Sequence, residues 1–266
     1  MPDPFILLKK GDIMEITDRI KEKLEEVELK ENVRVLFCAE SGSRSWGFAS
    51  PDSDYDARFV YVRPTEYYLA LGKTRDVIEW QLDDVYDING WDIQKYLRLL
   101  YASNATVFEW NNSPIVYKKT DEWDNISALL GRYFNRRAML GHYLGLAKGN
   151  YLNNLTGETV KLKKYFYSLR PVLCARWIIE KGAPPPMPFA ELAAEVLDRS
   201  LTGEVGRLLE LKSQASEADR SPHIEALDRY LEESIAELSE LAQSIDPTGE
   251  KDWEPLDKAF RGLLGL

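Results

Sequence analysis

The chain has 266 residues, of which 44% are hydrophobic and 29% charged, and its formal net charge at pH 7 is −10. This length suits one large domain or two smaller ones, and no apolar run is long enough for a membrane-spanning helix, so we expect no membrane partner. The N-terminus lacks the basic-then-apolar order of a signal peptide, and Cys38 and Cys174 both lie in apolar surroundings. We therefore expect reduced, buried thiols in a cytoplasmic protein.

The negative charge is unevenly distributed along the chain. Residues 191–266 carry 18 acidic and 8 basic side chains, whereas residues 121–190 carry 10 basic and 5 acidic ones. The acidic balance argues against broad, non-specific binding of nucleic acid. The basic surplus in the middle leaves room for a polyanion site, although most of these charges are expected to lie on solvated helix faces.

The first part of the chain alternates helix and strand signals. Apolar residues at helical spacing predict an opening helix over residues 12–27. Buried or alternating patterns predict strands near 33–38, 55–62, 76–81 and 84–88, and a helix from Asn89 or Gly90 to about Leu100. We therefore expect an α+β unit with a mixed sheet over residues 1–118.

The rest of the chain reads as an all-helical domain over residues 119–266. The patterns predict helices over about 122–132, 134–150, 157–181, 188–199, 203–216 and 221–244. Pro184-Pro185-Pro186 cannot continue a helix and marks a bend or connector. The apolar residues between Ala259 and Leu266 are expected to dock onto the body of the protein or onto a partner.

The run Gly42-Ser43-Arg44-Ser45-Trp46-Gly47, followed by Asp54-Tyr55-Asp56, carries the strongest chemical signal. Side chains two residues apart on a strand point the same way, so Asp54 and Asp56 should share a face of the strand at 55–62. Two neighbouring carboxylates repel each other, and a hard divalent cation removes the conflict. A glycine-serine turn beside them offers backbone N–H groups to a phosphate.

Other motifs fail at these positions. An EF-hand loop would need glycine where the chain has Ala57 and glutamate where it has Arg63. A P-loop would need Lys and Ser/Thr where Phe48 and Ala49 stand. An ordinary turn accounts for Asp52, but it explains Asp54 and Asp56 less well, because aspartate is depleted in strands.

These residues carry a family resemblance. Ser41-Gly42-Ser43 and Asp54-Tyr55-Asp56-Ala57-Arg58 resemble the signature of the DNA polymerase beta-like nucleotidyltransferase superfamily, which has a third acid on a later strand. The run ESGSRSWGFASPDSDYDARFVYV is similar to the branch of predicted nucleotidyltransferases associated with RNA ligase and RNA repair systems. The later blocks GWDIQKYLRLL, SNATVFEWNNSPIVY and KLKKYFYSLRPVLCARWI also fit this branch, so the resemblance covers roughly residues 12–190.

The third acid has two candidates. Asp87 in Val85-Tyr86-Asp87-Ile88 has the apolar flanks that the resemblance implies, and we favour it. Glu79 in Ile78-Glu79-Trp80 is the alternative, because spacing alone does not fix strand order. Asp83 and Asp84 are predicted to be solvated turn residues.

The resemblance implies a metal-dependent enzyme that transfers a nucleotide from a nucleoside triphosphate. Asp54, Asp56 and Asp87 would hold two Mg²⁺ or Mn²⁺ ions and act as the catalytic residues, and Gly42, Ser43 and Arg44 would contact the phosphates. The implied acceptor is an RNA, either a tRNA or a broken RNA end. A hydroxyl of a protein or small molecule is an alternative acceptor, and a non-catalytic nucleotide-binding module is an alternative class.

The helix predicted over 157–181 supplies a second group of candidates. Leu162, Phe166, Leu169 and Leu173 recur at helical spacing and should face the core. Lys163, Tyr167 and Arg170 form a neighbouring stripe. With the resemblance, we expect Lys163, Lys164 and Arg170 to hold the triphosphate and Tyr167 to stack on a base or sugar. A solvated basic face is the alternative.

Overall fold

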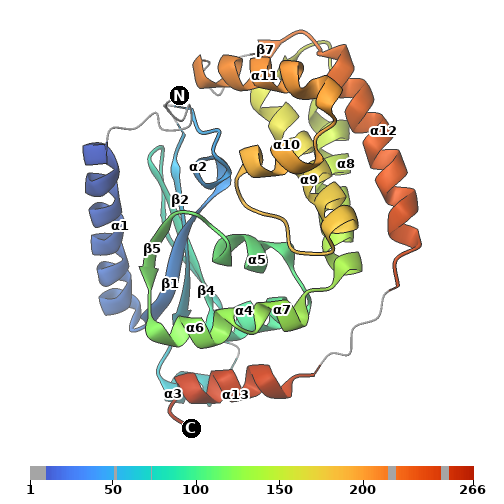
Figure 1. The fold of residues 1–266 in the computed structure, drawn as a ribbon. Coiled ribbons are helices and arrows are strands. Elements are labelled where there is room, and N and C mark those ends of the chain that lie inside the picture. Colours follow the sequence, from blue (N-terminus) through green and yellow to red (C-terminus); the bar gives the residue numbers. More distant parts are fainter. Residues whose placement is uncertain (1–9, 51–52, 73, 215–219, 247–251) are drawn as a thin grey trace.

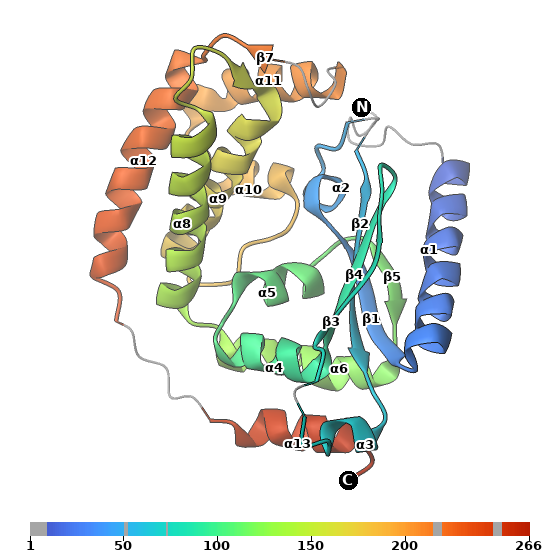
Figure 2. The same cartoon turned by 180° about the vertical axis from the view of Figure 1, so that it is seen from behind.

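A computed structural model describes residues 10–50, 53–72, 74–214, 220–246 and 252–266. It has the expected α+β architecture, with a five-stranded mixed sheet in the N-terminal part and a helical C-terminal region (Figures 1 and 2). Among the helices it describes, none is both long and apolar enough to cross a bilayer.

The N-terminal part contains the sheet and the helices that flank it. Its elements are α1 (Lys10–Glu31), β1 (Arg34–Ser41), α2 (Gly42–Trp46), β2 (Tyr55–Val62), α3 (Thr65–Tyr68), β3 (Val77–Leu82), β4 (Tyr86–Asp92), α4 (Ile93–Tyr101), α5 (Ala105–Asn111) and β5 (Val116–Lys119). The strand order is β3-β4-β2-β1-β5, and β2 and β4 are parallel while the other neighbours are antiparallel.

The two faces of the sheet are covered by different elements (Figure 1). On one face, Ile20 and Leu24 of α1 share a buried cluster with Phe59 of β2. On the other face, Val60 of β2 belongs to a cluster with Tyr96 of α4 and with residues of the helical region. Successive residues of β2 therefore enter two different cores, because neighbouring side chains of a strand point to opposite faces of the sheet.

The C-terminal region is built from helices and one short hairpin. Its elements are α6 (Asp121–Ser127), α7 (Leu130–Tyr133), α8 (Arg136–Asn154), β6 (Val160–Lys161), α9 (Leu162–Lys181), α10 (Phe189–Val196), the 3₁₀ helix η1 (Arg199–Leu201), α11 (Thr202–Gln214), β7 (Arg220–Ser221), α12 (Glu225–Gln243) and α13 (Glu254–Leu263). The packed pair α8 and α9 forms its centre, with α10 and α12 against it.

The two parts share one continuous hydrophobic cluster, which runs from β1 through α4 and α5 into α8 and α9. The last helix, α13, returns to the N-terminal part and lies beside α3 (Figure 2). There the ring of Phe260 packs edge-on against Tyr68 at 5.1 Å. The expected docking of the C-terminal apolar residues onto the body is thus confirmed. The boundary between 118 and 119 stays a prediction, and β5 itself extends to Lys119.

Three predicted helix bounds are wrong. Asn89 and Gly90 do not begin a helix, because β4 continues to Asp92, whose carboxylate caps α4 by accepting the N–H of Gln94 at 2.8 Å. The helix predicted from residue 157 begins at Leu162, since Val160–Lys161 pairs with β7. The helix predicted over 122–132 is split into α6 and α7.

The prediction for the cysteines is confirmed. Cys38 lies in β1 and Cys174 in α9, and both are free and fully buried.

Candidate active site

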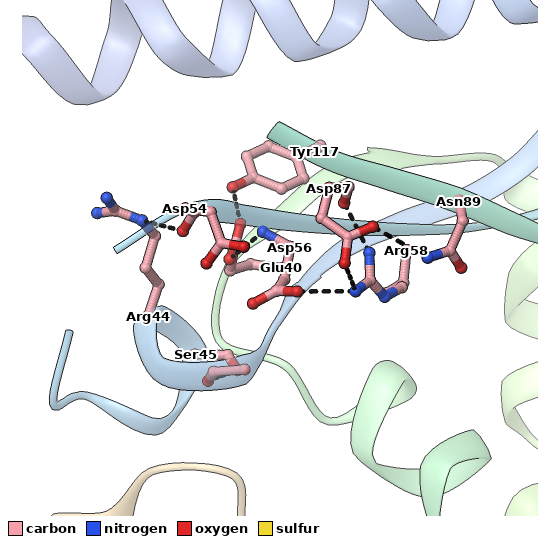
Figure 3. Close-up of polar contacts among 10 residues, drawn as sticks. Glu40, Arg44, Ser45, Asp54, Asp56, Arg58, Asp87, Asn89 and Tyr117 are labelled. Carbon is pink, nitrogen blue, oxygen red and sulfur yellow. Dashed lines mark hydrogen bonds and ion pairs between the residues drawn. The ribbon is translucent and has the colours of Figure 1, made fainter. Parts of the chain in front are cut away.

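Three carboxylates gather at one end of the sheet, as Figure 3 shows. Asp54 lies immediately before β2, Asp56 is its second residue, and Asp87 is the second residue of β4. Asp56 and Asp87 are direct partners in the parallel pairing of β2 and β4. This pairing, which joins residues far apart in sequence, brings the predicted third acid beside the first two.

Glu79, the alternative third acid, lies one step further along the sheet. It is exposed on β3 and pairs with Asn89 of β4. The Asn89 amide in turn donates to Asp87 Oδ1 at 3.3 Å. The geometry therefore favours Asp87 over Glu79 as the partner of Asp56.

The guanidinium of Arg58 lies between Asp56 and Asp87 (Figure 3). Its Nη2 donates to Asp56 Oδ1 at 2.7 Å and to Asp87 Oδ2 at 2.6 Å, and its Nη1 donates to the main-chain oxygen of Asp87 at 2.6 Å. The Arg58 side chain is only 14% exposed. A single cation thus offsets the repulsion between two partly buried carboxylates.

Burial raises the pKa of Asp56 to about 6. Arg58 acts in the opposite direction, while the negative charges of Asp54 and Asp87 raise the pKa further. Ionised Asp56 is therefore held in surroundings that still disfavour its charge, even with Arg58 in place. Further positive charge at this point would be stabilising.

Gly42 sits against the carboxylate of Asp56. A Cβ added to Gly42 would lie 2.2 Å from Asp56 Oδ2, and its φ of +69° is one that side-chain-bearing residues rarely adopt. Ser43 follows as a buried residue of α2. The glycine is thus required both by the turn and by the close approach of the backbone to the carboxylate.

Arg44 is engaged with the main chain of the segment before β2. Its Nε donates to the oxygen of Asp54 at 2.8 Å and its Nη2 to the oxygen of Ser53 at 2.5 Å. The guanidinium also stacks on the ring of Tyr55, 3.7 Å from its centroid. In this arrangement Arg44 holds the segment that presents Asp54.

The α9 candidates divide into two groups. Tyr167 packs edge-on against Trp46, the last residue of α2, at 5.8 Å, and the Lys164 ammonium lies 5.3 Å from the Tyr167 ring centroid. Lys163 lies one residue before Lys164 and is half-buried. This end of α9 therefore neighbours the helix that begins at the glycine-serine turn.

Arg170 does not belong with the phosphate-binding candidates. It is 3% exposed, its Nη1 donates to Glu109 Oε1 at 2.7 Å, and its guanidinium lies 4.7 Å from the ring of Trp46. A guanidinium in the core with a carboxylate partner has no access to a ligand. The predicted contact of Arg170 with a triphosphate is therefore wrong, and Arg170 instead packs against Trp46 at the end of α2.

Sequence reasoning missed two buried charged residues near the site. Glu40 in β1 is fully buried and accepts the main-chain N–H of Asp56 at 2.9 Å. Lys212 in α11 is 3% exposed and donates to Ser50 Oγ at 2.7 Å, in the segment that leads to Asp54. An acidic residue directly after the apolar run Val35–Ala39 was a signal for Glu40, whereas no sequence pattern marks Lys212.

The donor chemistry at the site suits a hard divalent cation, although the present arrangement is occupied by Arg58. Across the described parts of the chain, no three His, Cys, Asp or Glu side chains are arranged to hold a metal ion. Carboxylate oxygens are nevertheless the ligands that Mg²⁺ and Mn²⁺ prefer. Gly42 has no side chain to cover Asp56 Oδ2, and the raised pKa of Asp56 shows that its ionised form would be stabilised by a further cation.

Two comparisons with known proteins identify the family of the chain. The chain is 39% identical over 229 residues to the uncharacterized protein YcgL of Bacillus subtilis (strain 168), and the match covers 85% of this chain and 88% of that protein. The sequence profile of the RNA repair pathway DNA polymerase beta family matches residues 16–262, almost the full length. The chain therefore belongs to the RNA repair pathway DNA polymerase beta family.

Proposed function

We propose that the protein is a metal-dependent nucleotidyltransferase. It would move a nucleoside monophosphate from a nucleoside triphosphate to an acceptor hydroxyl and release pyrophosphate. The observation that carries this proposal is the pairing of Asp56 with Asp87 across β2 and β4, with Asp54 two residues before Asp56 and Gly42 against the Asp56 carboxylate.

Asp54, Asp56 and Asp87 would hold the metal ions. Bound there, Mg²⁺ or Mn²⁺ would lower the pKa of the acceptor hydroxyl and neutralise charge on the leaving pyrophosphate. Arg58, which joins two of these carboxylates, would move aside as the metal takes its place. Its positive charge would then lie beside the site, where a phosphate arrives.

The glycine-serine turn would bind the triphosphate. Gly42 lacks a side chain, so the main chain beside Asp56 stays accessible, and the N–H groups at the start of α2 suit phosphate oxygens. Arg44 would act on the turn and on Asp54 through its bonds to the main chain. Lys163, Lys164 and Tyr167 of α9 lie beside α2 and are the candidates for the tail and sugar of the nucleotide.

An RNA is the proposed acceptor, either a tRNA or a broken RNA 3′ end. The support is the family, whose description refers to an RNA repair pathway. The basic surplus of residues 121–190 is compatible with a polyanion near the helical region.

The test is a transfer assay with labelled ATP, CTP, GTP or UTP, Mg²⁺ and RNAs with either a free or a blocked 3′ hydroxyl. We expect labelled RNA and pyrophosphate only with the free hydroxyl. Asp56→Asn should abolish the transfer, while Asp84→Asn, at an exposed hairpin position near Asp87, should leave it unchanged.

Other outcomes would refute the proposal in distinct ways. Label on a protein or small molecule would replace the RNA acceptor. Nucleotide binding without pyrophosphate release would identify a regulatory binding module. Equal transfer by Asp56→Asn and the wild type would contradict the assignment of the site itself.

A further inference from the structure

We propose that Glu40 is a positioning residue that fixes Asp56 through its main-chain N–H group. This inference rests on the proposed function, because the position of Asp56 matters only if its carboxylate takes part in the chemistry. Figure 3 shows Glu40 joined by hydrogen bonds to the main chain of Asp56 and to Tyr117.

Both oxygens of the Glu40 carboxylate accept hydrogen bonds. Oε1 accepts the N–H of Asp56 at 2.9 Å, and Oε2 accepts the hydroxyl of Tyr117 in a short hydrogen bond. The main chain of Glu40 is held as well, since its N–H donates to the oxygen of Ile115 at 2.9 Å and its oxygen accepts from Ser113 Oγ at 2.7 Å. The segment from Ser113 to Tyr117 therefore holds both the main chain and the side chain of Glu40, and Glu40 holds the main chain of Asp56.

Strand pairing alone does not require a carboxylate here. A strand N–H is usually satisfied by a main-chain oxygen, and a neutral amide oxygen would also accept it. Glu40 is 0% exposed, and its two donors are a main-chain amide and a phenol, both of them neutral. Burying a carboxylate without a close cation is costly, so this residue has a role that a cheaper acceptor would not fill.

That role follows from its place behind Asp56. A hydrogen bond from an amide to a carboxylate is stronger than one between neutral groups. It holds the Asp56 backbone in one position while Gly42 limits the Asp56 side chain from the other direction. Ligand groups have to be held closely to bind a metal productively, and supporting hydrogen bonds supply that precision.

Glu28, near the end of α1, provides a control that accepts a main-chain N–H at the other end of β1. Its Oε1 accepts the main-chain N–H of Val35 at 2.7 Å, near the start of β1, but it is also paired with the ammonium of Lys118 at 2.8 Å. It performs the same local task as Glu40 at the end of β1 away from the aspartates. Loss of either carboxylate should weaken the sheet, but only loss of Glu40 should disturb Asp56.

The experiment compares Glu40→Leu, Glu40→Gln and Glu28→Leu in the full chain. It measures hydrogen exchange of the Asp56 amide, the affinity for Mn²⁺, and nucleotide transfer per folded molecule. In Glu40→Leu we expect faster exchange and weaker Mn²⁺ binding, each by about tenfold or more, which is the scale of one lost hydrogen bond to a charged group. Glu40→Gln should restore both only in part, because its amide oxygen accepts the same N–H in a weaker hydrogen bond between neutral groups, and Glu28→Leu should change neither.

The two proposals fail in different ways. Equal Mn²⁺ affinity and transfer in Glu40→Leu and Glu28→Leu would overturn the positioning role. A wild type that binds no Mn²⁺ and releases no pyrophosphate would refute the proposed function, and it would also overturn any role of Glu40 in holding a metal ligand. If Glu40→Leu fails to fold, Tyr117→Phe removes one donor instead. We expect the same changes at smaller size, and no change in Asp56 exchange would overturn the role.

Discussion

Replacing Arg58 by methionine tests whether one guanidinium stands in for a metal between Asp56 and Asp87. The variant keeps much of the length of the side chain but removes its charge and three donated hydrogen bonds. The side chains of the two aspartates are only 20% and 24% exposed, so they would face each other with little solvent between them. Removing one partner of a buried ion pair costs about 3–5 kcal/mol.

Thermal unfolding measures this change. In a protein of this size each kcal/mol shifts the midpoint by about 2–4 °C, so Arg58→Met should unfold roughly 10 °C below the wild type without metal. A ligand at 100 times its dissociation constant restores about 2.7 kcal/mol. Mn²⁺ should therefore raise the midpoint of Arg58→Met more than that of the wild type, where the cation has to displace the guanidinium.

The loss should also depend on pH with a defined sign. Burial raises the pKa of Asp56 to about 6, and Arg58 is the larger of two cationic groups, with Arg44, that lower it. Without Arg58 the pKa of Asp56 rises further, so the folded variant is most stable when this carboxyl is protonated and loses stability as the pH rises through 6 and above. The difference between Arg58→Met and the wild type should thus be smaller at pH 5 than at pH 8.

Arg34→Met is the control for this substitution. Arg34 forms an ion pair with Glu122, but the two side chains are 44% and 47% exposed, so its loss should cost about 0–1 kcal/mol and should not respond to Mn²⁺. Our interpretation of Arg58 is refuted if Arg58→Met unfolds within about 2 °C of Arg34→Met, or if Mn²⁺ raises both midpoints equally.

Three further predictions use other features of the chain. Gly42→Ala should abolish nucleotide transfer because its Cβ would collide with Asp56. The control is Gly47→Ala, where φ is +85° but the space around the residue is open, so this change should lower only the free energy of unfolding, by about 1–2 kcal/mol. Equal losses of transfer in the two variants would contradict this prediction. Gly145→Ala, on an exposed position of α8, should raise the free energy of unfolding by about 1 kcal/mol in urea titrations, and no gain would show that the helix needs this glycine. His223 bonds through one ring nitrogen to the oxygen of Gly157 and through the other to Asp228 Oδ2, and these two acceptors raise its pKa. Only the protonated ring donates both bonds, so the wild type should be more stable than His223→Gln by its full margin below about pH 6.5, and this margin should shrink as the pH rises above that value. A difference in thermal unfolding midpoint that stays constant with pH would refute this prediction.

Local patterns in the sequence were enough to predict most of the fold. The strand over 55–62 was predicted with the bounds that β2 has, because its alternation is regular and Pro51 and Pro64 lie outside it. The helix start at Asn89 was wrong because these residues look like a turn in sequence. In the structure Gly90 instead provides room for the ring of Phe59, where a Cβ would lie 2.2 Å away. That requirement comes from a neighbouring strand and has no local signature.

The same limit applies to the site. Asp54 and Asp56 could be predicted because strand periodicity places them on one face. Asp87 required the resemblance, since the parallel pairing of β2 and β4 joins distant parts of the chain. The predicted contact of Arg170 with the triphosphate was wrong because helical spacing gives the direction of a side chain but not the residues that pack against it. Glu109, which is distant in the sequence, pairs with Arg170 inside the core.

Several contacts of the helical region with the N-terminal part fall on the end of α2 and on the residues that follow it. Trp46 lies against Tyr167 and over Arg170, and the ring of Phe48 stacks on Phe166 at 4.6 Å. Lys212 then reaches Ser50, shortly before Asp54. These contacts lie between the turn at Gly42 and Asp54, and residues 47–50 and 53 belong to no helix or strand. The helices thus hold the residues before Asp54 from outside, as the strand pairing holds Asp56 from within, and we expect the sheet and the helical region to act as one unit.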